Sequence, residues 1–253
     1  KADMWRMPAL YVGQYAERDA EATLKLWQRL NVEIRNQELT EVFKLETDLF
    51  PCLVDMRFKG VRVDLEKAAF IKKDLMAREA KIISKIKKLT GLEVEIHAAR
   101  SIAKAFDKLK LPYDRTAKSN EPSFTKNFLQ NHPHELATCI ADAREINKAH
   151  TTFIDSITKH AHKGRIHADI NQIRSDQGGT VTGRFSMSNP NLQQIPARHP
   201  EIGPMIRSIF IPEEKHKWGC FDYSQQEPRI LVHYAKLQNL EGVDEIVDAY
   251  NAG

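Results

Sequence analysis

The chain has 253 residues, of which 42% are hydrophobic and 28% are charged. This composition is ordinary for a soluble globular protein with one large domain or two smaller ones. It has no apolar run near the roughly 18 residues of a membrane span, and its start does not resemble a signal peptide. Its three cysteines form neither a C-x-x-C pair nor a zinc spacing, so we expect reduced thiols in a cytosolic compartment and no membrane partner.

The net charge of +4 is unevenly distributed along the chain. Residues 59–118 carry 16 Lys or Arg and 8 Asp or Glu, whereas the flanking segments are mildly acidic. A basic middle segment suggests an element that binds a polyanion. The alternative is a pair of solvated helices with Lys on the outer face.

The first predicted element is a helix over residues 11–49, ended by Pro51 because proline breaks a helix interior. Residues 52–63 carry Gly60 between short apolar runs and favour a strand or hairpin. A second helix should start after Asp64 as N-cap and close at Gly91.

The rest of the chain alternates between helical and strand patterns. Residues 92–130 contain Pro112 and Pro122 and predict a small irregular tip. Residues 135–160 predict a third helix, antiparallel to the second. From Gly164 onward apolar and polar residues alternate, which is typical of strands. We expect further strands at 207–212 and 217–221 and a helix from 229 to 236. The sequence thus predicts an α+β fold that is mainly helical.

Asp222 follows the predicted strand 217–221. Phosphoryl transfer requires carboxylates that hold divalent metal ions beside the phosphates, and a strand end fixes such a carboxylate while leaving it open. Alternatively, Asp222 only ends the strand or caps the next helix.

Residues 222–229 read Asp-Tyr-Ser-Gln-Gln-Glu-Pro-Arg and resemble the motif D-Y-S-Q-I-E-L-R of family A DNA polymerases. The resemblance implies that Asp222 binds both catalytic metal ions and that the backbone carbonyl of Tyr223 helps to hold one of them. It implies that Glu227 lies under the sugar of the incoming nucleotide as a steric gate against a ribose 2′-hydroxyl. Arg229 would support the site without touching the metal.

Glu227 has a second role open to it. Ser224 and Glu227 have the spacing of a capping box at a helix start. Pro228 would then occupy the fourth helical position, so we expect the regular helix to begin later than the box implies. Gln226 and Pro228 replace the family's Ile and Leu in the turn that aims Glu227.

A polar loop precedes this motif. Residues 180–186 read Thr-Val-Thr-Gly-Arg-Phe-Ser and residues 190–196 read Pro-Asn-Leu-Gln-Gln-Ile-Pro, similar to the family's T-x-T-G-R-L-S and P-N-L-Q-N-I-P. Without that context, a polar loop with no nucleic-acid contact is the usual explanation. In the family these side chains meet the primer terminus and the minor groove, where the acceptors are common to all base pairs. The DNA-binding residues implied by the match are Arg184, Asn191, Gln193 and Arg198.

Two further sets of residues follow from the same resemblance. Tyr15 and Asp19 match the last motif, Y-x-x-x-D, of a 3′–5′ proofreading exonuclease, in which Asp19 would bind a metal ion and Tyr15 would orient the attacking water. A pair on a helix surface is the alternative. The antiparallel basic helices would form the thumb, with candidate phosphate contacts at Ser101, Lys104, Arg144 and Lys148.

The resemblance implies three domains: the end of the exonuclease at 1–50, the thumb with its tip insertion at 51–163, and the N-terminal part of an antiparallel palm, entering the fingers, at 164–253. It implies a DNA-directed DNA polymerase that uses two Mg²⁺ ions, primer-template DNA and deoxynucleoside triphosphates. The location expected is a bacterial or phage-infected cytoplasm, with an organelle as the alternative.

A complete site of this kind needs fingers residues and a second palm carboxylate, which we do not find in the sequence. We therefore expect a segment that is inactive alone, either as part of a longer polymerase or as one half of a split one, with the remainder as its partner. A non-catalytic DNA-binding subunit and a single-subunit RNA polymerase are the other hypotheses. Glu227 and the Thr-x-Thr-Gly-Arg run argue against the RNA polymerase.

Overall fold

The computed structural model describes residues 3–175, 178–197 and 199–252. The chain divides into two compact units, residues 1–211 and 212–253. The fold is mainly helical with small antiparallel sheets, which confirms the predicted α+β class. No helix in the described ranges is both long enough and apolar enough to cross a membrane.

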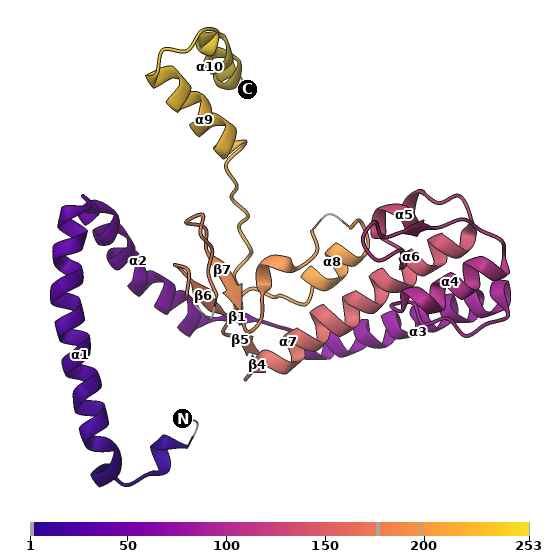
Figure 1. Cartoon of the computed structure of the whole chain (residues 1–253), viewed down its shortest axis with the longest axis horizontal. Helices are drawn as coiled ribbons and strands as arrows, with labels where there is room; N and C mark the ends of the chain where they lie inside the picture. Colours follow the sequence, from indigo (N-terminus) through magenta and orange to yellow (C-terminus); the bar gives the residue numbers. More distant parts are fainter. Residues whose placement is uncertain (1–2, 176–177, 198, 253) are drawn as a thin grey trace. The chain divides into compact units, whose positions relative to one another are not determined.

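The first unit begins with two long helices (Figure 1). They are α1 (Ala9–Asn36) and α2 (Thr40–Lys59), so the predicted single helix over 11–49 is wrong. The chain breaks instead near Glu38, which has a φ of 56°. α2 then runs through Pro51, where one helical hydrogen bond is lost. Its continuation buries Leu53 and brings Arg57 to 2.7 Å from Asp169, and this tertiary anchoring outweighs the proline penalty.

A helical arm, residues 65–160, forms the largest part of the first unit. Its elements are α3 (Leu65–Thr90), α4 (Ala99–Lys108), β2 (Asp114–Arg115), β3 (Pro122–Ser123), α5 (Lys126–Asn131), α6 (Glu135–Lys148), the π-helical segment Ala149–Ile154 and α7 (Asp155–His160).

Both predicted caps of α3 are confirmed: the Asp64 carboxylate accepts from the Lys67 N–H, and Gly91 is left-handed. α3 and α6 pack side by side in opposite directions (Figure 1). The tip is more regular than predicted, because α4 buries a stripe that includes Ile102 and Phe106.

Two separate clusters of apolar side chains form the interior of the first unit. The outer core lies between the tip and the distal halves of α3 and α6; its fully buried members include Ile86, Ile102, Phe106, Leu129, Leu136 and Ile140. The base core lies where the arm meets the sheets; its fully buried members include Leu75, Ile154, Ile157, Ile166, Ile206 and Ile209.

Short strands surround the base core. β1 (Val61–Arg62), β5 (Arg165–Ile166) and β4 (Ala161–His162) form one antiparallel sheet in that order, and β6 (Asp169–Asn171) pairs with β7 (Ser186–Ser188). Gly60 is required where α2 turns into β1, since its φ is 63° and a Cβ there would lie 2.6 Å from the Ile166 carbonyl oxygen. The predicted strand over 52–63 is thus reduced to two residues.

The strand predicted over 207–212 is not formed as a regular strand. α8 (Ile202–Arg207) ends at the first residue of this segment, a turn follows, and Phe210 makes a single bridge to Val63. Ile202, Ile206 and Ile209 are buried in the base core, which is the spacing of one helical face.

The second unit consists of an irregular segment followed by α9 (Gln226–Leu237) and α10 (Val243–Ala252). The two helices pack together, with Lys236 Nζ 2.9 Å from an Asp244 carboxylate oxygen. The strand predicted over 217–221 is wrong, and Phe221 is 96% exposed. A strand needs a neighbouring strand for its hydrogen bonds, and the described part of this unit provides none.

Candidate functional site

Asp222 lies in the irregular segment just before α9, with its side chain open to solvent. Tyr223 beside it is 81% exposed. A carboxylate and an adjacent backbone carbonyl are oxygen ligands of the kind that Mg²⁺ prefers. However, no cluster of three or more His, Cys, Asp or Glu suited to a metal ion occurs among the described residues. A two-ion site therefore fits this chain only in part.

The start of α9 bears on the capping role considered for Glu227. The N-cap is Gln225, in a left-handed conformation and without a side-chain cap hydrogen bond, and the helix begins at Gln226. The helix thus starts later than a box at Ser224 requires, as we expected. Pro228 falls in the first turn, where its missing N–H has no helical partner to lose. Glu227 is exposed on the same turn.

Arg229 ties this turn together. Its Nε donates to the Ser224 carbonyl at 3.0 Å, and its guanidinium lies 4.9 Å from the centre of the Tyr250 ring on α10. The structure therefore brings Asp222, Tyr223, Glu227 and Arg229 together on one short segment. Arg229 acts there through the backbone that precedes α9.

The loop between β6 and β7 carries the Gly-Arg run in the first unit. Its turn depends on Gly179, where a Cβ would lie 2.2 Å from the Ile173 carbonyl oxygen. The Gly179 N–H donates to the Ser186 hydroxyl at 3.1 Å. The Thr180 hydroxyl donates to the Arg184 carbonyl at 2.6 Å. These contacts hold the backbone of the loop, while Arg184 lies exposed on it.

Asn191 and Gln193 lie beside this loop and contact its backbone. The Asn191 side chain accepts from the Gln193 N–H at 3.1 Å and caps the 3₁₀ turn Leu192–Gln194. The Gln193 amide accepts from the Met187 N–H at 3.2 Å and donates to the Phe185 carbonyl at 3.1 Å. The structure thus gathers Arg184, Asn191 and Gln193 into one loop cluster. Arg198 lies outside the described residues.

Arg144, one of the expected phosphate contacts, is held by backbone carbonyls of the tip. Its Nε donates to the Ile96 carbonyl at 2.6 Å and its Nη1 to the Phe124 carbonyl at 2.7 Å. Burial lowers the pKa of this guanidinium. Arg144 therefore fastens the tip of the arm to α6, because a cation with two carbonyl partners satisfies backbone acceptors that would otherwise be buried alone.

The other three arm candidates differ in how far they are engaged. The Ser101 hydroxyl accepts from the Glu95 N–H at 2.9 Å. Lys104 and Lys148 are exposed, and the Lys148 ammonium lies 5.8 Å from the centre of the Phe153 ring. Lys148 also lines a groove of about 550 Å³ between α6 and residues 194–202, together with Lys126 and Gln194. Lys126 could not be singled out from the sequence, because the groove joins segments far apart in the chain.

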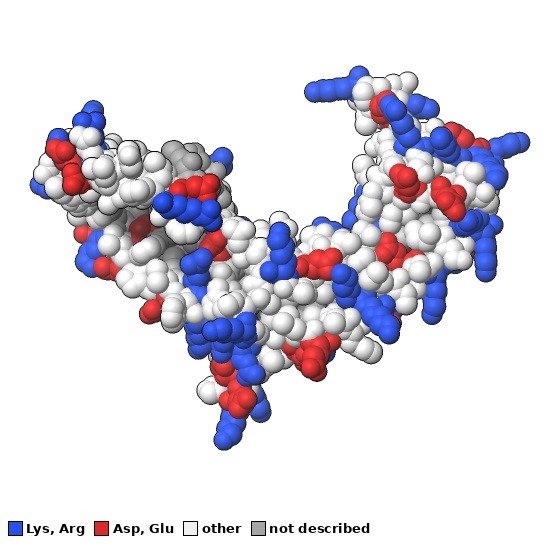
Figure 2. Space-filling view, turned by 90° about the horizontal axis from the view of Figure 1, so that it is seen from below, with Lys and Arg blue, Asp and Glu red and all other residues white. Residues whose placement is uncertain are grey.

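Several cations of the basic middle segment have acidic partners. Its ion pairs include Lys72–Asp155, Lys85–Glu135, Lys87–Glu93 and Arg100–Glu121. Figure 2 shows Lys and Arg side chains interspersed with Asp and Glu over one face. Some of the Lys and Arg side chains of residues 59–118 are therefore in ion pairs, and the excess positive charge lies on the others.

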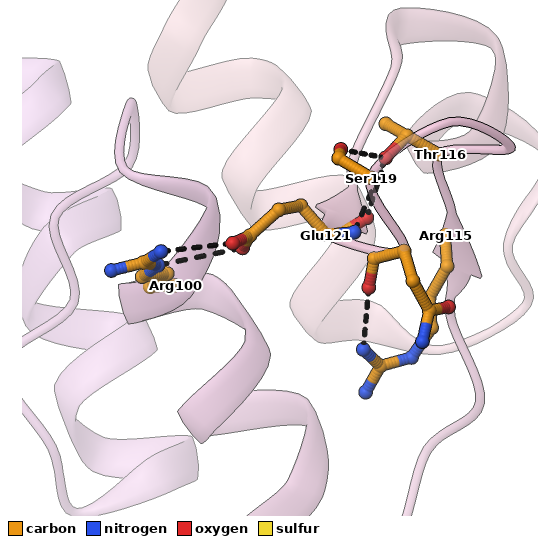
Figure 3. Close-up of polar contacts among 6 residues, drawn as sticks. Arg100, Arg115, Thr116, Ser119 and Glu121 are labelled. Atoms are coloured by element: carbon orange, nitrogen blue, oxygen red, sulfur yellow. Dashed lines mark hydrogen bonds and ion pairs between the residues drawn. The ribbon is translucent and has the colours of Figure 1, made fainter.

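The Arg100–Glu121 pair also orders the hairpin of the tip (Figure 3). Arg100 on α4 donates to both Glu121 oxygens, at 2.9 and 3.4 Å. The Thr116 hydroxyl lies 2.7 Å from that of Ser119 and accepts from the Glu121 N–H. Arg115 donates to the Asn120 carbonyl at 2.8 Å. The side chains of the hairpin are thus engaged largely with one another.

Tyr15 and Asp19 lie one turn apart on α1. A hydrogen bond to the Asp19 carboxylate, together with its negative charge, raises the pKa of the Tyr15 hydroxyl. The two side chains therefore interact on one face of the helix. Within the described residues, Asp19 belongs to no metal-binding cluster.

Comparison with known proteins decides the family. The sequence model for DNA polymerase family A matches residues 66–249, which is most of the chain. The chain belongs to DNA polymerase family A. The resemblance carried by residues 180–196 and 222–229 is therefore confirmed at the level of the family.

Relatives within family A include phage and bacterial polymerases. The chain is 36% identical over 247 residues to a DNA-directed DNA polymerase of Pseudomonas phage M6, covering 94% of this chain and 37% of that protein. It is 34% identical over 268 residues to DNA polymerase DpoZ of Acinetobacter phage SH-Ab 15497, covering 98% and 42%. The chain thus spans about two fifths of the length of these relatives.

A solved family A structure has a similar fold. The POL domain of Pol1 from M. smegmatis, in complex with DNA primer-template and dNTP, matches with a TM-score of 0.60 and 26% identity. The match covers 73% of this chain and 32% of the other.

Proposed function

We propose that this chain is part of a template-directed DNA polymerase that adds deoxynucleotides to a primer 3′ end. The observation that carries the proposal is the family A match over residues 66–249, which includes two motif runs on exposed segments. We propose further that residues 1–50 end a 3′–5′ exonuclease domain, that residues 51–163 form the thumb, and that residues 164–253 begin the palm and enter the fingers.

Each exposed group has a role in this proposal. Asp222 and the Tyr223 carbonyl would hold Mg²⁺, which when bound offsets negative charge on the reacting phosphate. Glu227 would exclude a ribose 2′-hydroxyl, and Arg229 would keep the α9 turn in place. Arg184, with the loop that Gln193 holds, would contact the primer end through minor-groove acceptors.

The arm would bind the duplex through its phosphates. Lys104 and Lys148 are exposed cations there, and each phosphate contact releases counterions from DNA. Arg144 would contribute only through its remaining N–H groups, because its Nε and Nη1 are engaged with two backbone carbonyls. The partners proposed are primer-template DNA, deoxynucleoside triphosphates, and the residues that complete the metal site. The setting proposed is a bacterial or phage-infected cytoplasm.

Primer extension by the intact protein, meaning the complete polymerase that contains this chain, tests the proposal. We expect the primer to lengthen in the order of the template with Mg²⁺ present and to stop lengthening when EDTA is added. Glu227→Ala should raise the use of ribonucleotides relative to deoxyribonucleotides. Duplex binding without extension would show a DNA-binding subunit instead, and equal use of both sugars by the unaltered protein would favour an RNA polymerase.

A further inference from the structure

The apolar stripe of α3 is interrupted at one position halfway along the arm. Leu75 belongs to the base core and Ile82 packs against the outer core. Glu79 lies four residues after the first and three before the second, which places it on the same helix face. A carboxylate therefore lies at the boundary between the two cores.

The apolar face of the opposite helix, formed by α6 and the π-helical segment after it, is interrupted at the same level along the arm. Ala143 is buried in the outer core, and Ile154 is buried in the base core. Between them, at helical spacing, lie Asn147 and His150. The boundary between the cores is thus polar from both sides of the arm.

Hydrogen bonds join these side chains into one layer. The Glu79 Oε2 lies 2.6 Å from His150 Nε2, and the Asn147 amide donates to Glu79 Oε1 at 2.8 Å. The side-chain oxygen Oδ1 of Asn147 lies 3.1 Å from His97 Nε2 in the loop that leads to α4. Both carboxylate oxygens are therefore engaged, and the layer connects three segments of the arm.

This layer is buried at a cost. His150 is 6% exposed, and its Nδ1 has no hydrogen-bond partner within the described structure. A buried ionic or polar group is often no more stabilising than apolar residues of similar volume, but its hydrogen bonds accept fewer geometries. The layer is therefore suited to fix one alignment of α3 and α6.

The layer coincides with the π-helical segment Ala149–Ile154, of which His150 is the second residue. A π-turn interrupts the regular helix and is frequent at functional positions. Lys148 lies between Asn147 and His150, both of which contact Glu79, so the layer constrains the backbone that carries Lys148. That lysine faces the groove it shares with Gln194.

We propose that Glu79, Asn147 and His150 are positioning residues that align the outer arm on its base for duplex binding. They touch neither nucleotide nor metal, and their effect on DNA passes through Lys148 and the tip. The expected effect on DNA binding rests on the proposed function. The expected effect on the arm itself is on the mobility of residues 149–157, which is measured without DNA.

The test compares four variants of the intact protein. Glu79→Leu leaves buried partners without an acceptor, and we expect its melting temperature to fall. Glu79→Leu combined with His150→Phe makes the boundary largely apolar and should recover much of that loss. His150→Gln keeps a donor toward Glu79. Glu93→Gln removes an exposed carboxylate paired with Lys87 and serves as the charge-matched control.

The double variant gives the deciding result. Amide hydrogen exchange of residues 149–157 should accelerate by about tenfold or more. The Kd for primer-template should rise about tenfold, while kcat at saturating DNA stays within about twofold. His150→Gln and Glu93→Gln should remain near the unaltered protein in both measurements.

The two proposals fail in different ways. A folded double variant with unchanged exchange and unchanged Kd would overturn the positioning layer. Accelerated exchange with an unchanged Kd would also overturn it, because the layer would then be structural only. If the unaltered protein bound no primer-template, the proposed function would be refuted. The amide exchange rates would still show whether the polar layer aligns the outer arm on its base.

Discussion

The helical arm and the segment that carries Asp222 differ in what determines their structure. The arm buries two apolar cores, is capped by Asp64, and holds even its polar residues in defined hydrogen bonds. Residues 217–223 have no regular structure, and Phe221 is almost fully exposed. The motif that begins at Asp222 thus lies on backbone with little packing around it. The packing that stabilises the fold lies in the arm, which is a different part of the chain.

Aromatic truncations should show the largest difference between the two regions. Phe106 is fully buried in the outer core, whereas Phe221 lies in the motif segment. We expect Phe106→Ala to lower the free energy of unfolding by about 3–5 kcal/mol because it leaves a cavity. Phe221→Ala should change it by less than about 0.5 kcal/mol. Denaturant titration of both variants measures this, and equal losses would show that Phe221 is buried in the folded protein.

Two glycines of the Gly-Arg loop sharpen the comparison within one motif. A Cβ at Gly179 would meet backbone atoms, while at Gly183 it would meet nothing within 4 Å. Gly179→Ala should therefore destabilise the β6–β7 hairpin by about 3 kcal/mol, and Gly183→Ala by about 1 kcal/mol, the cost of a positive φ. Exchange rates of the β6 and β7 amides report these values. A larger effect at Gly183 would contradict the loop geometry.

Helix caps provide the smallest of the three contrasts. Asp64 accepts a hydrogen bond at the start of α3, whereas α9 starts without a side-chain cap. Asp64→Ala should cost about 1 kcal/mol of unfolding free energy, and Ser224→Ala should cost less than about 0.5 kcal/mol. Thermal unfolding distinguishes them. A clear loss for Ser224→Ala would restore the capping box as the role of Glu227.

The sequence predicted the features that depend on neighbouring residues. The boundaries of α3 follow from Asp64 and Gly91, and the antiparallel arm follows from two long apolar periodicities. The segment at 217–221 has the composition of a strand, but a strand exists only through its partner, and pairing is a non-local property. The local pattern predicts a helix end at Pro51, because the anchor at Asp169 is distant in sequence.

The candidate site also has features that neighbouring residues predict and features that depend on residues distant in sequence. The runs around Arg184 and Asp222 identified the family, and both lie on exposed segments. The carbonyl contacts of Arg144 could not be predicted, since its partners at Ile96 and Phe124 are distant in sequence. The polar layer did leave a signal: Glu79 interrupts an apolar stripe at a position where a leucine would be expected.

The central claim is that Asp222 acts in catalysis and does not hold the fold or the DNA. Single-turnover primer extension by the intact protein, with Asp222→Asn beside the exposed control Asp107→Asn, tests it most directly. We expect Asp222→Asn to lower the rate by at least about a thousandfold, because several kcal/mol of metal-dependent stabilisation is lost. The Kd for primer-template should stay within about threefold, since Lys and Arg, and not a carboxylate, supply the attraction to DNA phosphates. Extension by Asp222→Asn at the rate of the unaltered protein would contradict the account.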